Sequence, residues 1–220
     1  MIFLRLYKKI IIVYNFNKWL SDCNQTCWER VIVIKGTNLA NPSNLVKKIM
    51  FASNNNGSNI CIFLSHISED KDSVVKIGDY IQDAGFNIYL DIYDENLNRA
   101  VKSGNPEEIT KSIERGLEYS THVMCIVSEK TVKSWWVPYE IGFGKRSKKP
   151  LSTLTLKNTV TIPSYLEVTD LIRGTAGLND YLSTISKQDY LLSKSVSSFI
   201  ELNKNTKSIH PLDNYLDWQK

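Results

Sequence analysis

Apolar runs of strand length alternate with amphipathic helical patterns between residues 59 and 186. The run from Ile60 to Leu64 has no polar interruption, which is typical of a strand that is buried on both faces of a parallel sheet. Similar runs predict strands over residues 87–91, 122–127 and 151–156. Because parallel neighbours need crossover connections and helical patterns lie between these runs, we predict an α/β fold. Its doubly wound parallel sheet would carry helices on both faces.

The helices between the strands are recognised by apolar spacing and by their first residues. Apolar side chains three or four positions apart before Gly85 predict one helix, which Ser68 would cap. Asn105 followed by Pro106 predicts a second helix start, because Asn caps well and Pro fits the first turn. Pro138 places the start of a third helix at residue 135 or 136. Two further helical patterns cover residues 178–185 and 196–202.

An Asn- and Ser-rich stretch from Ser53 to Asn59 is predicted to be a linker. It divides the chain into a basic N-terminal extension (1–58), a central domain (59–186) and a C-terminal helix and tail (187–220). Of the 27 basic and 23 acidic side chains, eight and two lie before residue 59, which leaves 19 and 21 after it. The net charge of +4 therefore comes from the extension. Nucleic-acid binding through the extension is an alternative function, but we expect no nucleic-acid partner.

Composition excludes several classes of protein. With 42% hydrophobic and 23% charged residues the chain is globular, not disordered, collagen-like or a coiled coil. Cys61 and Cys125 lie in apolar runs and are expected to be buried thiols, while Cys23 and Cys27 lack the further ligands of a zinc site, so no metal is expected. The apolar run from Ile10 to Tyr14 is far shorter than the ~18 residues that cross a bilayer, so we expect a cytoplasmic protein without a membrane span.

Polar side chains follow the predicted strands at the edge where parallel sheets bind ligands. Ser65 and His66 follow the first strand, and Asp91 follows the second at the start of a polar loop of roughly fifteen residues, long enough to be functional. Trp136 and Glu140 lie one turn apart on the helix after the third strand. We therefore expect the chemistry of the protein at this edge.

Three stretches at this edge, ICIFLSHISED, NIYLD before a loop containing Ser103-Gly104, and SWWVPYEIG, together resemble the TIR (Toll/interleukin-1 receptor) domain family. The resemblance is to the bacterial kind, as in antiphage defence systems such as Thoeris, and implies a flavodoxin-like sheet. It also implies an enzyme that cleaves the nicotinamide–ribose bond of NAD+, with NAD+ as substrate and no other cofactor. The Glu of Trp-x-x-x-Glu, here Glu140, would be catalytic. Self-association and a downstream effector that senses a nucleotide product would follow.

The reaction fits a single carboxylate, because neutral nicotinamide leaves a cationic pyridinium without a general acid. Glu140 would stabilise the oxocarbenium-like ribose, and Trp136, or alternatively Trp135, would stack on a substrate ring. Ser65, His66 and Asp91 would contact the substrate by resemblance to the family.

Structural roles are the alternatives for the same residues. Glu140 could be a solvated helix residue and Trp136 a core residue. His66 could bond a backbone carbonyl, and Asp91 could cap a turn. A non-catalytic interaction module is the alternative function, and the sequence leaves hydrolysis and cyclisation of ADP-ribose both open.

Overall fold

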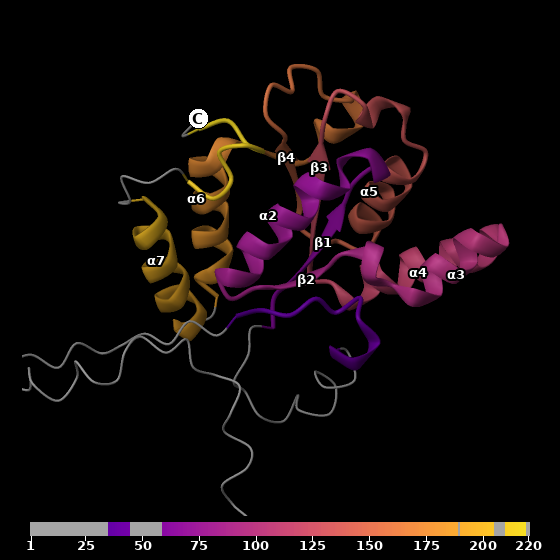
Figure 1. The fold of residues 1–220 in the computed structure, drawn as a ribbon, viewed down its shortest axis with the longest axis horizontal. Coiled ribbons are helices and arrows are strands. Elements are labelled where there is room, and N and C mark those ends of the chain that lie inside the picture. Colours follow the sequence, from indigo (N-terminus) through magenta and orange to yellow (C-terminus); the bar gives the residue numbers. More distant parts are fainter. Residues whose placement is uncertain (1–34, 45–58, 189, 205–209, 219–220) are drawn as a thin grey trace, which may run out of the picture. The chain divides into compact units, whose positions relative to one another are not determined.

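Five parallel strands form one sheet in the order β2-β1-β3-β4-β5 (Figure 1). The computed structural model describes residues 35–44, 59–188, 190–204 and 210–218, all within one compact unit of the chain. This strand order is the flavodoxin-like, doubly wound arrangement, so the predicted fold class is confirmed. The strands are β1 (Cys61–Ser65), β2 (Asn87–Tyr89), β3 (His122–Val127), β4 (Leu151–Thr155) and β5 (Asp170–Arg173).

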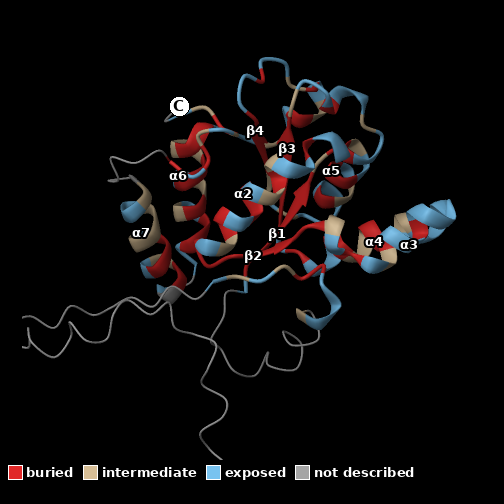
Figure 2. Ribbon diagram, viewed as in Figure 1, coloured by how far each residue is buried: buried red, intermediate tan, exposed pale blue. Residues whose placement is uncertain are grey.

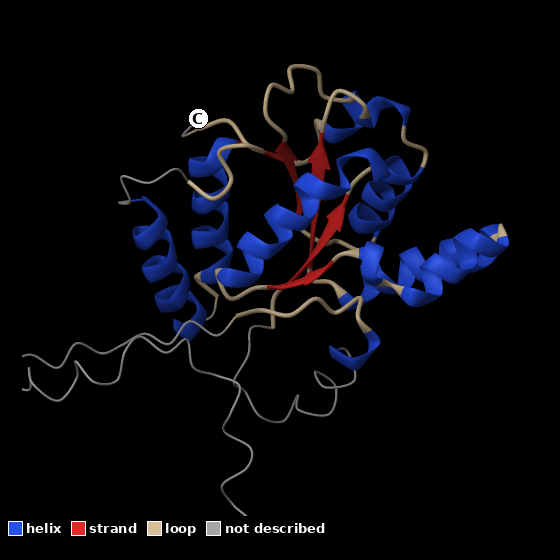
Figure 3. Ribbon diagram, in the orientation of Figure 1, coloured by secondary structure: helices blue, strands red, loops and turns tan. Residues whose placement is uncertain are grey.

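Helices cover both faces of the sheet because both faces are apolar (Figure 3). Successive strand residues point to opposite faces, so Ile62 and Leu64 join one core cluster while Phe63 joins the other. Figure 2 shows β1, β2 and β3 buried along their whole length. The first cluster packs against α2 (Lys71–Asp83), α6 (Gly174–Ser186) and α7 (Tyr190–Lys204), and the second against α4 (Pro106–Tyr119) and α5 (Trp136–Arg146).

The predicted helix starts agree with the structure in two places and differ in one. Asn105 Oδ1 accepts a hydrogen bond from the backbone N–H of Glu108 at 3.3 Å, and α5 begins at Trp136. Ser68 instead is the first residue of the short 3-10 helix η2 (Ser68–Asp70), whose cap residue is Ile67, and the cap residue of α2 is Asp70. The prediction of a Ser68 cap is therefore wrong, because this extra turn delays α2 until Lys71.

The polar loop predicted after β2 is wrong, because the segment forms a helix. After the 3-10 helix η3 (Asp91–Tyr93), Asp94 Oδ1 accepts hydrogen bonds from two backbone N–H groups at 2.8 and 3.1 Å and starts α3 (Glu95–Ser103). Leu97 and Ala100 are buried, and Gly104 ends the helix with a φ of 63°. Figure 1 shows α3 beside α4.

Other parts of the structure lie outside the predicted pattern. The edge strand β5 was not predicted, nor were the 3-10 helices η4 (Thr131–Lys133) and η5 (Ser164–Leu166). Residues 35–40 lie along the outer edge of β2. Cys61 and Cys125 are buried as expected, whereas Cys23, Cys27 and most of the predicted linker lie outside the described residues. The division of the chain after residues 58 and 186 stays a prediction.

Candidate functional site

A buried carboxylate lies against the carboxyl end of β1. Ser65 is the last residue of that strand, and its Oγ donates a hydrogen bond of 2.5 Å to Glu140 Oε2 on α5. Glu140 belongs to the buried stripe of α5 together with Val137 and Ile141, which directs its side chain inward. Glu140 is only 4% exposed, so its interpretation as a solvated helix residue is wrong.

The helix that carries Glu140 begins where the sequence dictates. Pro138 lies in the first turn of α5, where a missing N–H costs no helical hydrogen bond. Ser134, just before the helix, accepts a hydrogen bond at its Oγ from the N–H of Val137 at 3.1 Å. Glu140 therefore faces the sheet in the second turn.

The pKa of Glu140 is raised to about 8, chiefly by burial and also by the nearby negative charge of Asp91, while the hydrogen bond from Ser65 opposes the increase. The carboxyl group is therefore largely protonated at neutral pH. A cation that binds beside it would favour the ionised form, because opposite charge lowers the pKa of a carboxyl group. The state of Glu140 thus depends on what occupies the site.

His66 and Asp91 lie at the same edge of the sheet. His66 Nδ1 is 3.0 Å from the carbonyl oxygen of Leu64 and 3.8 Å from Asp91 Oδ1. That Asp91 oxygen is buried and has no hydrogen-bond partner among the described residues. Burial raises the pKa of Asp91, and the neighbouring His66 opposes that increase. His66 therefore bonds a backbone carbonyl, as one alternative predicted. It also lies beside Asp91, whose charge acts on Glu140.

Trp136 takes a different position from these four residues. It is 40% exposed, so its interpretation as a core residue is wrong. Its ring contacts Tyr139 edge to face at 6.1 Å, and the hydroxyl of Tyr139 donates to Glu114 on α4 at 2.5 Å. Trp135 is 91% exposed. The structure thus brings Ser65, His66, Asp91 and Glu140 together. Trp136 instead contacts Tyr139, which is hydrogen-bonded to α4.

Two further side chains feel the charge of Glu140 and were not predicted to lie near it. Cys125 on β3 is opposite Ser65 in the strand register, and its pKa is raised by burial and by the charge of Glu140. Tyr165 in η5 has a pKa raised to about 12 by burial, Cys125 and Glu140. The Tyr165 hydroxyl is buried without a hydrogen-bond partner in the described part of the chain. Strand register could have identified Cys125, but no local pattern marks Tyr165.

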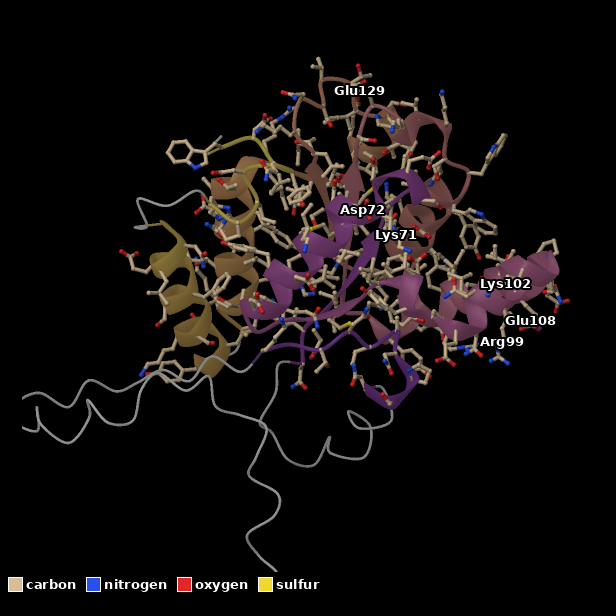
Figure 4. All side chains as sticks on the ribbon, viewed as in Figure 1. Lys71, Asp72, Arg99, Lys102, Glu108 and Glu129 are labelled. Atoms are coloured by element: carbon tan, nitrogen blue, oxygen red, sulfur yellow. The ribbon has the colours of Figure 1, made fainter. Side chains whose placement is uncertain are left out.

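Exposed charged side chains lie on the segments that follow β1 and β3. Figure 4 shows Lys71 and Asp72 at the start of α2 and Glu129 in the loop after β3. Glu129 accepts hydrogen bonds from the backbone N–H groups of Val160 and Thr161 at 2.6 and 2.9 Å, which joins the loops after β3 and β4. Within the described ranges, no group of His, Cys, Asp and Glu is arranged to hold a metal ion, and no helix has the length and apolar character to span a membrane.

Proteins named as cyclic ADP-D-ribose synthases or probable synthases are among the relatives of the chain. It is 31% identical over 134 residues to the probable 2' cyclic ADP-D-ribose synthase TcpO of Methanobrevibacter olleyae, covering 60% of this chain and 32% of that protein. It is 27% identical over 105 residues to the probable 3' cyclic ADP-D-ribose synthase ThsB' of Bacillus cereus (strain MSX-D12), covering 47% and 53%. The 2' cyclic ADP-D-ribose synthase BtTIR of Bacteroides thetaiotaomicron is 31% identical over 81 residues, covering 36% and 25%. The chain thus spans between a quarter and about half of the length of these relatives.

A solved structure and a family model complete the comparison. The TIR domain of the Toll-related receptor TRR-2 from Hydra magnipapillata is 18% identical with a TM-score of 0.41, covering 50% of this chain and 81% of that one. The family model for the TIR domain matches residues 62–183, more than half of the chain, including Ser65, Asp91 and Glu140. The resemblance seen in the three sequence stretches is confirmed, and the chain belongs to the TIR domain family.

Proposed function

We propose that the protein cleaves the nicotinamide–ribose bond of NAD+ and that Glu140 is its catalytic carboxylate. The observation that carries this proposal is the buried Glu140, held by Ser65 at the carboxyl edge of the sheet. Open α/β sheets bind ligands at this edge. The names of the relatives, which are cyclic ADP-D-ribose synthases, support the same chemistry.

The proposed reaction uses one carboxylate. The bond between C1' of the ribose and the pyridinium nitrogen breaks, and its electron pair neutralises the departing nicotinamide. Positive charge then develops on the ribose, beside the ionised Glu140, where a fixed negative charge stabilises the transition state most. The cationic nicotinamide ring of NAD+ would itself favour that ionised state. Ser65 would hold the carboxylate in place through its hydrogen bond.

The remaining candidate residues would bind the substrate. His66 and Asp91 lie at the same edge of the sheet as Glu140, where they would contact the nicotinamide riboside, and Trp136 has an exposed face on which a ring can stack. Lys71, at the start of α2, would attract the pyrophosphate, since the domain has no general positive charge to do so (Figure 4). NAD+ would be the substrate, with no further cofactor.

The product would be ADP-ribose or a cyclic isomer, depending on whether water or a hydroxyl of the substrate attacks the ribose. The relatives named as 2' and 3' cyclic ADP-D-ribose synthases favour a cyclic product. Such a product would serve as a signal in bacterial antiphage defence, sensed by a downstream effector. Self-association through the TIR domain would accompany activity.

The test is mass analysis of the products after incubation of the purified chain with NAD+. Wild-type protein should release nicotinamide together with ADP-ribose or its cyclic isomer, and Glu140→Gln should lose at least 100-fold in rate, the order expected when charge stabilisation is removed. Glu118→Gln is the matched control, because Glu118 is an exposed Glu on α4. Full turnover by Glu140→Gln would overturn the assignment.

The second candidate is a non-catalytic interaction module. The fully exposed Trp135 favours it, because large exposed aromatic side chains often anchor protein contacts. Binding to a partner TIR domain should survive Glu140→Gln and fail in Trp135→Ala, the opposite of what catalysis requires.

A further inference from the structure

We propose that residues 35–40, here called the N-terminal strap, are a positioning element for the site, in which Asn38 fixes the end of β2 and thereby Asp91. The strap precedes the matched TIR domain, which begins at residue 62. The inference rests on the proposed function for its catalytic meaning. Its structural part is independent of that function.

The strap pairs with β2 as an additional parallel edge. Leu39 N–H donates to the carbonyl of Ile88 at 2.8 Å, and Ile88 N–H donates to the carbonyl of Thr37 at 3.0 Å, which makes a parallel bridge between Asn38 and Ile88. β2 is the edge strand of the sheet, so these bonds satisfy backbone groups that would otherwise be open. The strap thus continues the ladder on the outer side of β2.

Asn38 extends this pairing by one residue with its side chain. Its Oδ1 accepts a hydrogen bond from the N–H of Leu90 at 3.1 Å, and its Nδ2 donates to the carbonyl of Leu90 at 3.5 Å. The amide therefore contacts both backbone groups of Leu90, as a neighbouring strand would. Leu90 directly precedes Asp91, so the backbone is fixed where it turns from β2 into η3.

The strap is anchored in the core that supports Glu140. Leu39 is 1% exposed and Ala40 is 4% exposed, and both belong to the cluster that contains Tyr89 and Val137. Gly36 lies so close to β2 that a Cβ there would be 1.7 Å from the carbonyl oxygen of Phe86. These contacts leave the strap little freedom to shift relative to β2.

The position of Asp91 affects Glu140 through the negative charge of the Asp91 carboxylate. The titratable groups that act with Glu140 come from three elements, namely Asp91 of η3, Cys125 of β3 and Tyr165 of η5. Of these, Asp91 is the one whose backbone follows the residue held by Asn38. Release of Leu90 would let Asp91 move into solvent and would weaken its effect on the carboxylate.

The experiment compares full-length Asn38→Ala with Asn41→Ala, a matched change in the neighbouring exposed turn. Hydrogen exchange over residues 86–92 should accelerate about fivefold or more in Asn38→Ala and stay unchanged in Asn41→Ala, as expected for loss of buried hydrogen bonds. A carboxyl ¹³C titration of Glu140, assigned by comparison with Glu140→Gln, should show a lower pKa in Asn38→Ala. Asp91→Asn should lower that pKa in the same way, and adding Asn38→Ala to it should change nothing more.

Two results would overturn the proposal. Unchanged exchange over residues 86–92 would refute the fixing of β2, and faster exchange with an unaltered Glu140 titration would refute the positioning of Asp91. Neither readout needs turnover, so a chain that leaves NAD+ intact would refute the proposed function alone. If Asn38→Ala does not fold, Asn38→Gln, which displaces the amide by one methylene, provides the same comparison.

Discussion

Replacement of Glu140 by Gln should stabilise the fold, and the gain should grow with pH. The change keeps the shape of the side chain and an oxygen that can accept from Ser65 Oγ, but removes the ionisable group. The pKa of Glu140 is raised from its ordinary 4.5 to about 8 in the folded chain. Between these values the folded chain holds a proton that the unfolded chain releases, so wild-type stability falls as pH rises.

The size of this effect follows from the two pKa values. Ionising Glu140 in the folded chain costs about 5 kcal/mol more than in the unfolded chain. The penalty is about 1 kcal/mol at pH 5, about 3 kcal/mol at pH 7 and close to 5 kcal/mol at pH 9. It grows with pH as Glu140 ionises in the unfolded state, and it levels off once Glu140 also ionises in the folded state. The Glu140→Gln variant should not have this pH-dependent loss of stability. Its free energy of unfolding should otherwise differ from that of wild type only by a constant packing contribution.

Urea unfolding followed by circular dichroism at pH 5, 7 and 9 measures this gain. Other titrating groups are present in both proteins and largely cancel in the difference. The exposed Glu118→Gln should differ from wild type by a constant amount at all three pH values. If the stability difference between Glu140→Gln and wild type were equally constant from pH 5 to 9, the raised pKa of Glu140 would be refuted.

Three further predictions concern the surroundings of Glu140. Asp91→Asn should move the pH midpoint of NAD+ cleavage to lower pH, because a negative charge that raises the pKa of Glu140 is removed; a midpoint at higher pH would contradict this. Tyr165→Phe should leave stability unchanged or raise it slightly in urea unfolding, since its buried hydroxyl has no partner among the described residues; a loss of stability would show that the hydroxyl is bonded. Gly116→Ala should cost about 1–3 kcal/mol in the same assay, because its Cβ would lie 2.4 Å from the Tyr89 ring; unchanged stability would show that this ring moves freely.

The sheet could be predicted from sequence because its inner strands carry strong local signals. The run that became β1 is apolar at nearly every position, and His122–Val127 is buried throughout. β5 lacks this signal, because three of its four residues are exposed at the edge of the sheet. The polar composition of α3 predicts a loop, because few of its residues are apolar. Only Asp94 and Gly104 indicate the two ends of a helix.

The candidate site was predictable only as far as residues follow strand ends. Ser65, Asp91 and Glu140 could be placed at one edge because parallel strands share a direction. Tyr165 lies in a short turn between β4 and β5 and is brought in only by tertiary packing. Asn38 acts through the backbone of a residue 52 positions away, which no local pattern reveals.

Under the proposed function, the buried Ser65–Glu140 pair would link substrate capture to the release of a proton. Below a pKa of about 8 the free site holds a proton on Glu140, and a bound cation would drive it into solution. Affinity and pH are then reciprocally linked, so binding of NAD+ should tighten by up to tenfold for each pH unit until the pKa is passed. Under the proposed function, the site would exchange a proton for the cationic nicotinamide ring when it takes up NAD+, and the heat of binding would depend on the buffer that receives the proton.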